Sequence, residues 1–451
     1  MIESISSELL GDVLALARAE GADDGDAIGV AEVSTEVRVR RGAVETSSRA
    51  ESHELGLRVF VGDRSAIVST NDLRRETLVG LVRHAVAAAR QMDADADSRV
   101  ARADELAGPI PALDLHDAAV SALDAATLID MARRAEGAAL DADPRIVNSE
   151  GGEASAGESA VTFATMAGVV RERRSTSVGV VAVPIAEQDG AMEVDWWYAS
   201  GRRVAALPSP ESIGKTAAER TLRRLGARSL ATRQVPVIFE GPVASRLLSD
   251  FISALSGDRI ARKASYLDGR LGTPVAHASL NFRDDPTLPW GVASRAFDGE
   301  GFAARPWELV RDGVLVGLLT NLRAAARLGV GHGRNATRGA SSAPGVGATQ
   351  VHMAAGDRSL QQLMADVGTG LLVTSLMGHG SDLVRGQFSQ GAAGLWFENG
   401  QIAHAVSEIT VAGDLDTLWK SVVARADDLD AQRGVSAPSF LVEALTVAGA
   451  G

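Results

Sequence analysis

The sequence contains no cysteine among its 451 residues. Disulfide bonds are therefore excluded, and no thiolate can serve as a nucleophile or as a metal ligand. Aromatic residues make up only 4% of the chain, whereas hydrophobic residues make up 45%, so aliphatic side chains must fill most of the core. Because a chain of this length exceeds one ordinary hydrophobic core, we expect two domains, residues 1–232 and 233–451.

Basic residues and long apolar runs are also scarce. Lysine and arginine number 45 against 58 acidic residues, and no basic run is longer than Arg171–Arg174, which argues against a nucleic-acid-binding face. No apolar stretch approaches the roughly 18 residues that a membrane helix needs. The first residues, Met1–Ser4, lack the basic and then apolar layout of a signal peptide. We therefore expect a cytoplasmic protein without membrane or nucleic-acid partners.

Hydrophobic periodicity alternates between strands and single helices along the chain. From Ala27 to Thr70 apolar and polar residues alternate, which predicts a meander of antiparallel strands. Helical spacing occurs in several segments, including one that we expect to be capped by Asp72: Leu9–Arg18, Leu73–Met92, Ala126–Leu140, Ser359–Val367 and Leu415–Ala431. This alternation predicts an α+β fold with mostly antiparallel sheets and interspersed helices.

The stretch Met377–Gly413 is rich in glycine. Within it, Glu398-Asn399-Gly400 separates the apolar runs Leu395–Phe397 and Ile409–Val411, and Asn-Gly between apolar runs is the strongest short signal for a β-hairpin. The other glycines let a second backbone approach closely, as a peptide-binding groove requires.

The same stretch resembles the C-terminal signature of the TldD/PmbA family, in its PmbA (TldE) branch. The matching residues are Gly386, Phe388, Ser389, Gly391, Ala392, Ala393, Gly394, Trp396, Glu398, Asn399, Gly400, Glu408, Ile409 and Gly413. Three further segments are similar to the central and N-terminal motifs of the family: Asp285–Gly291, Phe297–Gly301 and Glu51–Phe60. The blocks occur in family order over most of the chain.

The resemblance implies one subunit of a heteromeric metalloprotease that acts on unfolded or small peptides. Chains of the TldD branch are expected to carry His-Glu-x-x-x-His on the helix that here follows Gly241-Pro242, with a cysteine as third zinc ligand at a position near Gly391. This chain has no cysteine and no histidine between His116 and His277. We therefore expect no metal ligand and no cofactor in this chain, and a TldD-type catalytic partner that carries the zinc. A homodimer of the isolated chain is an alternative assembly.

Small residues near the hairpin are the substrate-binding candidates. We expect exposed strands to add a peptide by edge pairing, backbone to backbone, at Ser389, Gly391, Ala392 and Gly394, with Glu398 beside them. On this hypothesis bulky replacements block peptide binding without unfolding the chain. A simpler interpretation is that Glu398 ends a strand and accepts hydrogen bonds from backbone N–H groups.

Two alternative functions stay open. One is a non-proteolytic protein that binds peptides or a regulator, as the older description of the family as gyrase modulators suggests. The other is a metal-independent hydrolase using a serine or His379, the one histidine held between glycines beside Ser381 and Asp382; the simpler interpretation is that His379 lies in a turn. Asp93–Ser98 resembles the start of a calcium loop but lacks its glycine, so we interpret it as a solvated acidic linker.

Overall fold

Residues 2–378 and 380–450 are described by a computed structural model, and their strands form four sheets. Most strand pairs are antiparallel, and helices alternate with groups of strands along the chain. The expected α+β fold class is therefore confirmed. Among the described helices, none is both long and apolar enough to cross a lipid bilayer.

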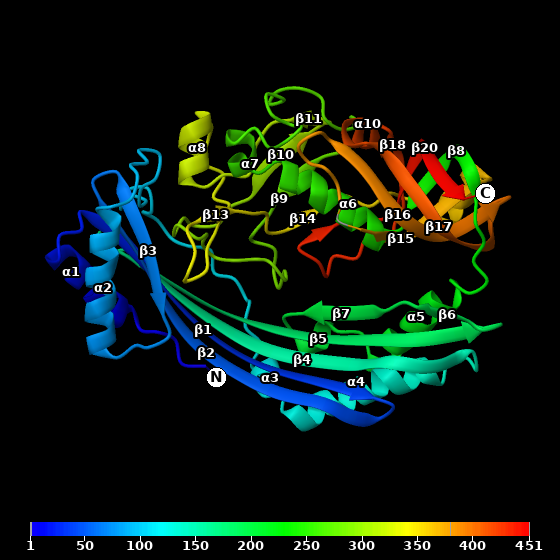
Figure 1. Cartoon of the computed structure of the whole chain (residues 1–451), viewed down its shortest axis with the longest axis horizontal. Helices are drawn as coiled ribbons and strands as arrows, with labels where there is room; N and C mark the ends of the chain where they lie inside the picture. The colour runs from blue at the N-terminus through cyan, green and yellow to red at the C-terminus, as the bar shows by residue number, and fades with distance from the viewer. Residues whose placement is uncertain (1, 379, 451) are drawn as a thin grey trace.

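The N-terminal half is built on one antiparallel sheet of seven strands. Its order is β3-β2-β1-β4-β5-β6, with β7 paired to β5. The strands are β1 (Asp24–Arg40), β2 (Ala43–Val61), β3 (Arg64–Thr70), β4 (Ile146–Thr165), β5 (Val170–Gln188), β6 (Ala191–Val194) and β7 (Trp197–Gly201). The meander expected between Ala27 and Thr70 is thus confirmed as β1, β2 and β3. Figure 1 shows the long strands bending into an arch beneath the C-terminal half.

Helices pack on the convex face of this arch. They are α1 (Ser7–Ala19), α2 (Arg75–Ala89), α3 (Ala118–Ser121), α4 (Ala125–Leu140) and α5 (Pro210–Leu222), with a short 3-10 turn η1 (Val204–Ala206) before α5. Apolar residues on alternate strand positions, such as Leu57 and Val37, meet the apolar stripes of these helices. The predicted cap of α2 is wrong: the N-cap is Arg74, while Asp72 accepts hydrogen bonds from Arg74 and Thr77.

The C-terminal half contains a closed barrel. Strand order is β17-β16-β15-β8-β20-β18, and an additional pairing of β17 with β20 joins the two sides. The strands are β8 (Ala231–Phe239), β15 (Gly370–Met377), β16 (Gln387–Glu398), β17 (Gln401–Asp414), β18 (Val422–Arg425) and β20 (Phe440–Ala450). Helix α6 (Gly241–Ala254) contributes Leu247, Leu248 and Phe251 to the same apolar core, where Phe251 packs against Trp419.

Shorter elements fill the remainder of the C-terminal half. They comprise a five-stranded sheet of β9 (Phe282–Asp284), β10 (Trp307–Arg311), β11 (Val314–Leu315), β14 (Val351–His352) and β19 (Val435–Ser436), a pair formed by β12 (Ala336–Thr337) and β13 (Gly345–Val346), and helices α7 (Gly257–Ala261), α8 (Leu322–Leu328), α9 (Leu360–Val367) and α10 (Leu415–Lys420). The long last helix predicted for Leu415–Ala431 is wrong, because the chain leaves the helix after Lys420 and pairs with β20 as β18.

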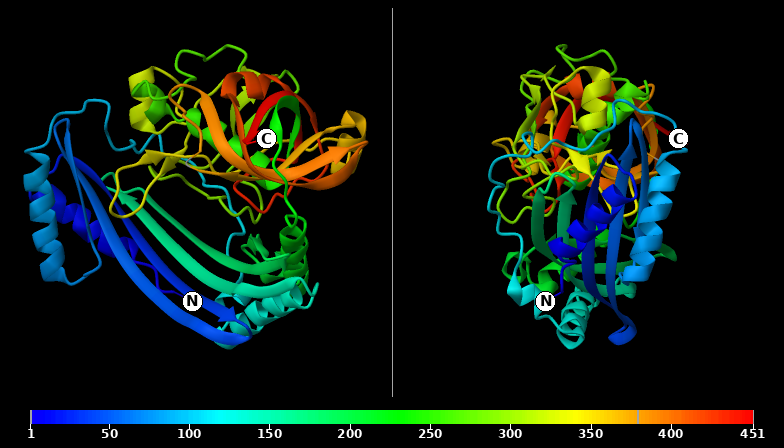
Figure 2. Two further views of the ribbon diagram at one scale, coloured as in Figure 1. Left: turned by 45° about the vertical axis from the view of Figure 1, so that its right-hand side comes forward. Right: turned by 90° about the vertical axis from the view of Figure 1, so that its left-hand side faces the viewer.

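Loops of the C-terminal half press onto the concave face of the arch, as Figure 1 and the two views in Figure 2 show. Phe297 and Ala340 pack against Phe163 of β4. Arg338 donates a 2.6 Å hydrogen bond to the buried carboxylate of Asp26. At Gly56 an added Cβ would lie 2.0 Å from the carbonyl oxygen of Ala340, so only glycine allows this approach. The division into domains at residues 232 and 233 stays a prediction.

A second contact corrects the sequence analysis. The acidic segment Asp93–Ser98 is not a solvated linker, because Asp95 forms ion pairs with Arg323 and Arg327 of α8. The N–O distances are 2.7 and 3.1 Å. The segment therefore fastens the loop after α2 to the C-terminal half.

Candidate functional site

Helix α6 is the element on which the resemblance would place zinc ligands. Its first turn contains Gly241 and Pro242, residue types that favour a helix start. Its apolar stripe is buried in the barrel core, and its polar side carries Arg246, Ser249 and Asp250. Ser253 of the last turn is exposed as well, so the chemistry available to α6 depends on these three side chains and on Ser253.

Arg246 and Asp250 bind the segment that follows β15. Arg246 donates from Nη1 to the carbonyl oxygen of Leu376 at 2.8 Å and from Nη2 to that of Gly378 at 3.0 Å. Ser381 donates to Oδ2 of Asp250 at 2.6 Å. We call this set the α6 clamp. Its bonds occupy the polar side of α6 with contacts inside the chain.

The structure also brings the second expected ligand position to this place. Gly391 of β16 pairs with Met377 of β15, and Met377 lies between the two residues whose carbonyl groups Arg246 holds. The two sequence blocks thus converge. The donor set does not fit zinc, however, because zinc takes histidine, cysteine and carboxylate ligands, whereas α6 offers an arginine, serines and one carboxylate already bonded to Ser381.

The five predicted substrate residues do not form one surface. Ser389 and Glu398 are exposed and Gly391 is half-buried, whereas Ala392 and Gly394 are buried. Strand β16 pairs with β17 along its length and with β15 from Gly391 to Phe397, so Gly391, Ala392 and Gly394 lie between two strands. Edge pairing of a peptide at Gly391, Ala392 and Gly394 is therefore wrong as a binding mode, whereas at Ser389 it stays a prediction. A role for these residues in substrate binding stays a prediction.

Glycine is required at one of these positions for packing. A Cβ on Gly394 would lie 2.2 Å from the carbonyl oxygen of Leu372, whereas a Cβ on Gly391 would meet only the side chain of Met377, at 3.6 Å. Glu398 accepts a 2.9 Å hydrogen bond from the indole of Trp396. The small size of Gly394 thus has a structural reason, and the expectation that a bulky residue there leaves the fold intact is wrong.

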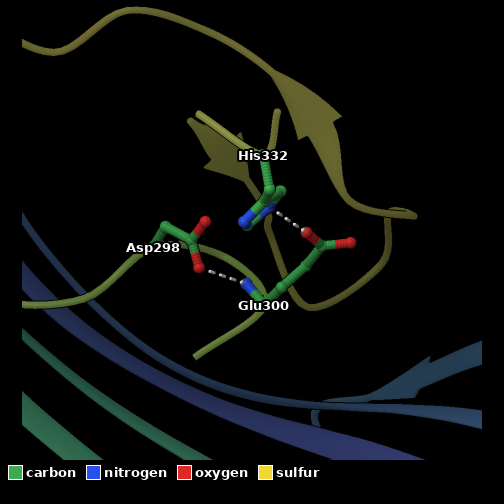
Figure 3. A group of neighbouring side chains, drawn as sticks. All are labelled: Asp298, Glu300 and His332. Carbon is green, nitrogen blue, oxygen red and sulfur yellow. Dashed lines mark hydrogen bonds and ion pairs between the residues drawn. The ribbon is translucent and has the colours of Figure 1, made fainter. Parts of the chain in front are cut away.

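The catalytic candidate His379 lies outside the described residues. Another histidine belongs to a cluster that the sequence analysis missed: Asp298, Glu300 and His332 place ligand atoms within 4.8 Å of one another (Figure 3). Asp298 and Glu300 stand in a block quoted for the family resemblance, but His332 lies in a loop after α8. The signal for this cluster was therefore only half visible in the sequence.

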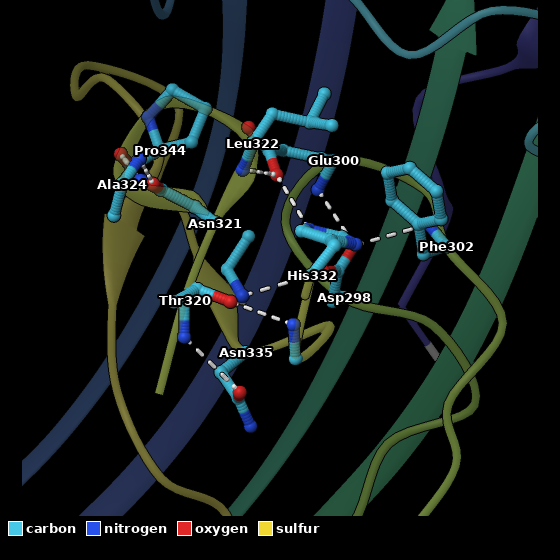
Figure 4. Close-up of polar contacts among 12 residues, drawn as sticks. Asp298, Glu300, Phe302, Thr320, Asn321, Leu322, Ala324, His332, Asn335 and Pro344 are labelled. Atoms are coloured by element: carbon cyan, nitrogen blue, oxygen red, sulfur yellow. Dashed lines mark hydrogen bonds and ion pairs between the residues drawn. The ribbon is translucent and has the colours of Figure 1, made fainter. Parts of the chain in front are cut away.

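Hydrogen bonds define what this cluster does (Figure 4). Oδ1 of Asp298 accepts from the amides of Glu300 and Phe302, at 2.9 and 3.0 Å. Oε2 of Glu300 accepts from the amide of Leu322, the first residue of α8, at 2.9 Å and lies 3.4 Å from Nε2 of His332. Burial, followed by the nearby charge of Glu300, raises the pKa of Asp298 to about 6. The cluster fastens its loop to α8 and can exchange a proton near neutral pH.

A polar trough follows the concave face of the arch. Strand register aligns Ser34, Gly157 and Ser177 across β1, β4 and β5, and aligns Glu36, Ser155 and Gly179 in a nearby row. These residues line two open cavities of about 340 and 480 Å³. Hydroxyl groups both donate and accept hydrogen bonds, and small residues leave room for a further chain. The trough therefore suits an extended polar ligand.

Comparison with known proteins agrees with this architecture. Three family models match in chain order: PmbA/TldA metallopeptidase domain 1 at residues 25–89, the central domain at 119–225 and the C-terminal domain at 232–449. Metalloprotease PmbA of Escherichia coli O157:H7 is 35% identical, covering 96% of this chain and 94% of its own. A Metalloprotease PmbA homolog of Haemophilus influenzae is 32% identical, covering 92% and 89%.

Solved structures share the fold over nearly the whole chain. A putative modulator of DNA gyrase from Bacteroides thetaiotaomicron has a TM-score of 0.91 at 28% identity, covering all of both chains. TldE from Thermococcus kodakarensis has a TM-score of 0.88 at 16% identity, covering 98% of this chain and 100% of its own, which is a likeness of fold alone. On the matching domain models and the full-length relatives, the chain belongs to the PmbA/TldD metallopeptidase family.

Proposed function

We propose that this chain is the PmbA/TldE-type supporting subunit of a cytoplasmic two-chain zinc peptidase, and that a TldD-type partner supplies the zinc site. Its substrates would be unfolded or small peptides. The α6 clamp carries the proposal. Where the resemblance expects zinc ligands, Arg246 and Asp250 instead fasten the segment after β15 to the helix.

The charge of Arg246 supports this assignment. A guanidinium group stays protonated at any physiological pH and donates hydrogen bonds without accepting any. A zinc ion beside it would meet a fixed positive charge and would lack the three protein ligands that catalytic zinc sites use. Helix α6 therefore offers no catalytic zinc site, and the family membership points to a TldD-type chain as the source of the zinc.

The trough gives the supporting subunit its substrate-binding surface. Its hydroxyl-lined rows can bond to the backbone of an extended peptide whatever the peptide's sequence, which suits unfolded substrates. Of the five residues on or beside the hairpin, Ser389 and Glu398 are exposed and can touch a ligand directly. We propose them as secondary contacts outside the trough.

A mixing experiment tests this function. Hydrolysis of an unfolded peptide is measured with this chain alone, with a TldD-type chain alone and with both, each with and without a zinc chelator. We expect chelator-sensitive hydrolysis in the mixture and none from this chain alone. Chelator-resistant hydrolysis by this chain alone would refute the proposal and direct attention to His379. Peptide binding without hydrolysis in the mixture would instead support a non-proteolytic binding protein.

A further inference from the structure

A group of arginines gathers where the trough meets a loop of the C-terminal half. Arg173 lies on β5, Arg202 and Arg203 follow β7, and Arg295 lies in the loop before Phe297. Throughout residues 2–378 and 380–450, no carboxylate forms an ion pair with any of the four. The other buried arginines of this region are paired: Arg58 and Arg338 share the carboxylate of Asp26. The unpaired group is thus a local exception.

Strand register directs Arg173 toward the loop. Arg173 is opposite Val161 of β4, and Val161 is opposite Val30 of β1, so the three side chains share the concave face. Val161 packs against Phe297 in a small apolar cluster. The guanidinium carbon of Arg173 lies 5.7 Å from the centre of the Phe297 ring. Arg173 therefore points from the sheet to the loop that carries Arg295.

Arg202 holds that loop in place. It donates from Nε to the carbonyl oxygen of Gly291 at 2.8 Å, and from Nη2 to those of Val292 and Ser294 at 2.7 and 3.2 Å. Its Nη1 donates to the carbonyl oxygen of Thr176 at 3.3 Å. Ser294 directly precedes Arg295, so the same turn fixes the positions of two guanidinium groups. The arginine group is consequently preorganised by main-chain contacts.

Arg295 has unused donors inside this group. Its side chain donates from Nη1 to the carbonyl oxygen of Ala336 at 2.7 Å, while Nε and Nη2 are buried without an acceptor. The residue is only 9% exposed. Nε of Arg173 is likewise buried without an acceptor. Buried donors and unpaired buried charges are both unfavourable, and an anion would satisfy both.

The electrostatic environment agrees with this geometry. Burial, with the charges of Arg295 and Arg202, lowers the pKa of Arg173 to about 10. Glu32, which is exposed on the next row of the same face, attracts Arg173. On the loop side, the buried carboxylates of Asp298 and Asp284 attract Arg295. The positive charge inside the group is therefore only partly offset from the trough.

Two cavities border the arginine group at Arg202. Arg202 lines the trough cavity of about 340 Å³ together with Ser159 and Ser175. Arg202 also lines a second cavity of about 340 Å³, in which Arg203 lies over Trp290 with 4.8 Å between the guanidinium carbon and the ring centre. A ligand that lies in the trough can thus place one end beside Arg202, next to the other arginines.

We propose that Arg173 and Arg295, held beside Arg202, bind an oxyanion at the end of the trough. Guanidinium groups match carboxylate and phosphate oxygens with paired hydrogen bonds. The oxyanion is either the terminal carboxylate of a peptide in the trough or a free inorganic anion such as phosphate. The peptide source rests on the proposed function, whereas the oxyanion site does not.

Calorimetric titration with phosphate at constant ionic strength tests the site. The variants are Arg173→Gln, Arg173→Lys and the control Arg174→Gln, which removes the same charge from the neighbouring position on the opposite face of β5. We expect Arg173→Gln to weaken phosphate binding roughly tenfold to a hundredfold, as for a lost charge-assisted hydrogen bond. Arg173→Lys should keep only part of the affinity, because lysine keeps the positive charge but lacks the paired donors of a guanidinium group. The control should bind like the wild type.

Thermal melting without phosphate separates binding from folding. Arg173→Gln should melt no lower than the wild type under these conditions, since it removes repulsion among the arginines. Phosphate should then raise the melting temperature of the wild type and of Arg174→Gln but not that of Arg173→Gln. An equal rise in all three proteins, or none in the wild type, would overturn an inorganic anion site.

A labelled unstructured peptide, prepared with a free C-terminal carboxylate and as its amide, identifies the source. Tighter binding of the acid than of the amide, lost in Arg173→Gln, assigns the site to peptide carboxylates. If the acid and the amide bind equally well, and phosphate binds in its own titration, the site is assigned to an inorganic anion. Failure to bind either peptide would count against the proposed function alone. If neither phosphate nor the peptide acid binds more tightly to the wild type than to Arg173→Gln, the oxyanion site is refuted.

Discussion

Replacing Gly394 by alanine should destabilise the barrel, and the structure indicates by how much. An added Cβ would lie 2.2 Å from the carbonyl oxygen of Leu372, whereas a relaxed carbon–oxygen contact needs roughly 3.3 Å. Strand β16 would have to retreat from β15 by roughly 1 Å in the middle of their ladder. Overpacking of this kind costs about 1–3 kcal/mol, and we expect the upper part of that range because the obstacle is backbone and cannot rotate away.

Gly391→Ala is the matched control three residues away on the same strand. Its Cβ would make an ordinary contact with Met377, and its φ angle is not in the left-handed region. A glycine to alanine change at such a position leaves stability unchanged or raises it by about 0.4–1 kcal/mol. Urea unfolding of both variants, followed by circular dichroism, should therefore separate them by about 3 kcal/mol. Equal midpoints would refute the close approach of β16 to β15.

Three further changes test other parts of the structure. Asp26→Asn should lower the free energy of unfolding by about 3–5 kcal/mol in calorimetry, because it leaves the guanidinium groups of Arg58 and Arg338 buried without their shared carboxylate. Because the pKa of Asp298 is raised to about 6, its protonated form stabilises the folded chain at low pH, and this stabilisation is lost as the pH rises through about 6. In urea titrations the wild type should therefore lose stability relative to Asp298→Asn between pH 4 and 6. A constant difference between the two proteins would contradict the raised pKa. Arg246→Ala should accelerate amide exchange around Leu376–Gly378 by about tenfold or more, with unchanged exchange counting against the clamp.

Local chemistry made the hairpin predictable. Asn399 and Gly400 have φ angles of 50° and 73°, and Glu398 pairs with Gln401. Asparagine and glycine tolerate these angles, which a two-residue turn between twisted strands requires. The signal is complete within four residues, so the sequence alone suffices.

Long-range pairing explains the failures. Apolar residues after Lys420 continue a helical spacing, yet Val422 pairs with Val442 because β20 lies alongside. Asp95 resembles a solvated acid until the fold places Arg323 and Arg327 beside it. In both cases the deciding partner is far away in sequence, and helix propensity or charge content gives no sign of it.

The candidate sites divide in the same way. Sequence reasoning located α6 and the strand position near Gly391, because the family resemblance expects ligands at both, but it did not foresee that Arg246 and Asp250 bind the segment between them. The arginine group was invisible, since Arg173 and Arg295 lie far apart in sequence: the register of β4 and β5 puts Arg173 on the concave face, and the loop that carries Arg295 packs against that face. Sites assembled from distant residues need the fold before they can be recognised.

The two halves are joined so closely that the trough is a fixed surface. Asp26 of β1 binds Arg338, and Gly56 of β2 allows the carbonyl of Ala340 to approach as no other residue could. The ring of Phe297, in a loop of the C-terminal half, lies beneath the guanidinium group of Arg173. A ligand in the trough would therefore meet arginines already held in position, so its binding costs little ordering of the protein. It follows that weakening the Asp26 contact should reduce ligand affinity as well as stability, although Asp26 itself is fully buried and cannot touch the ligand.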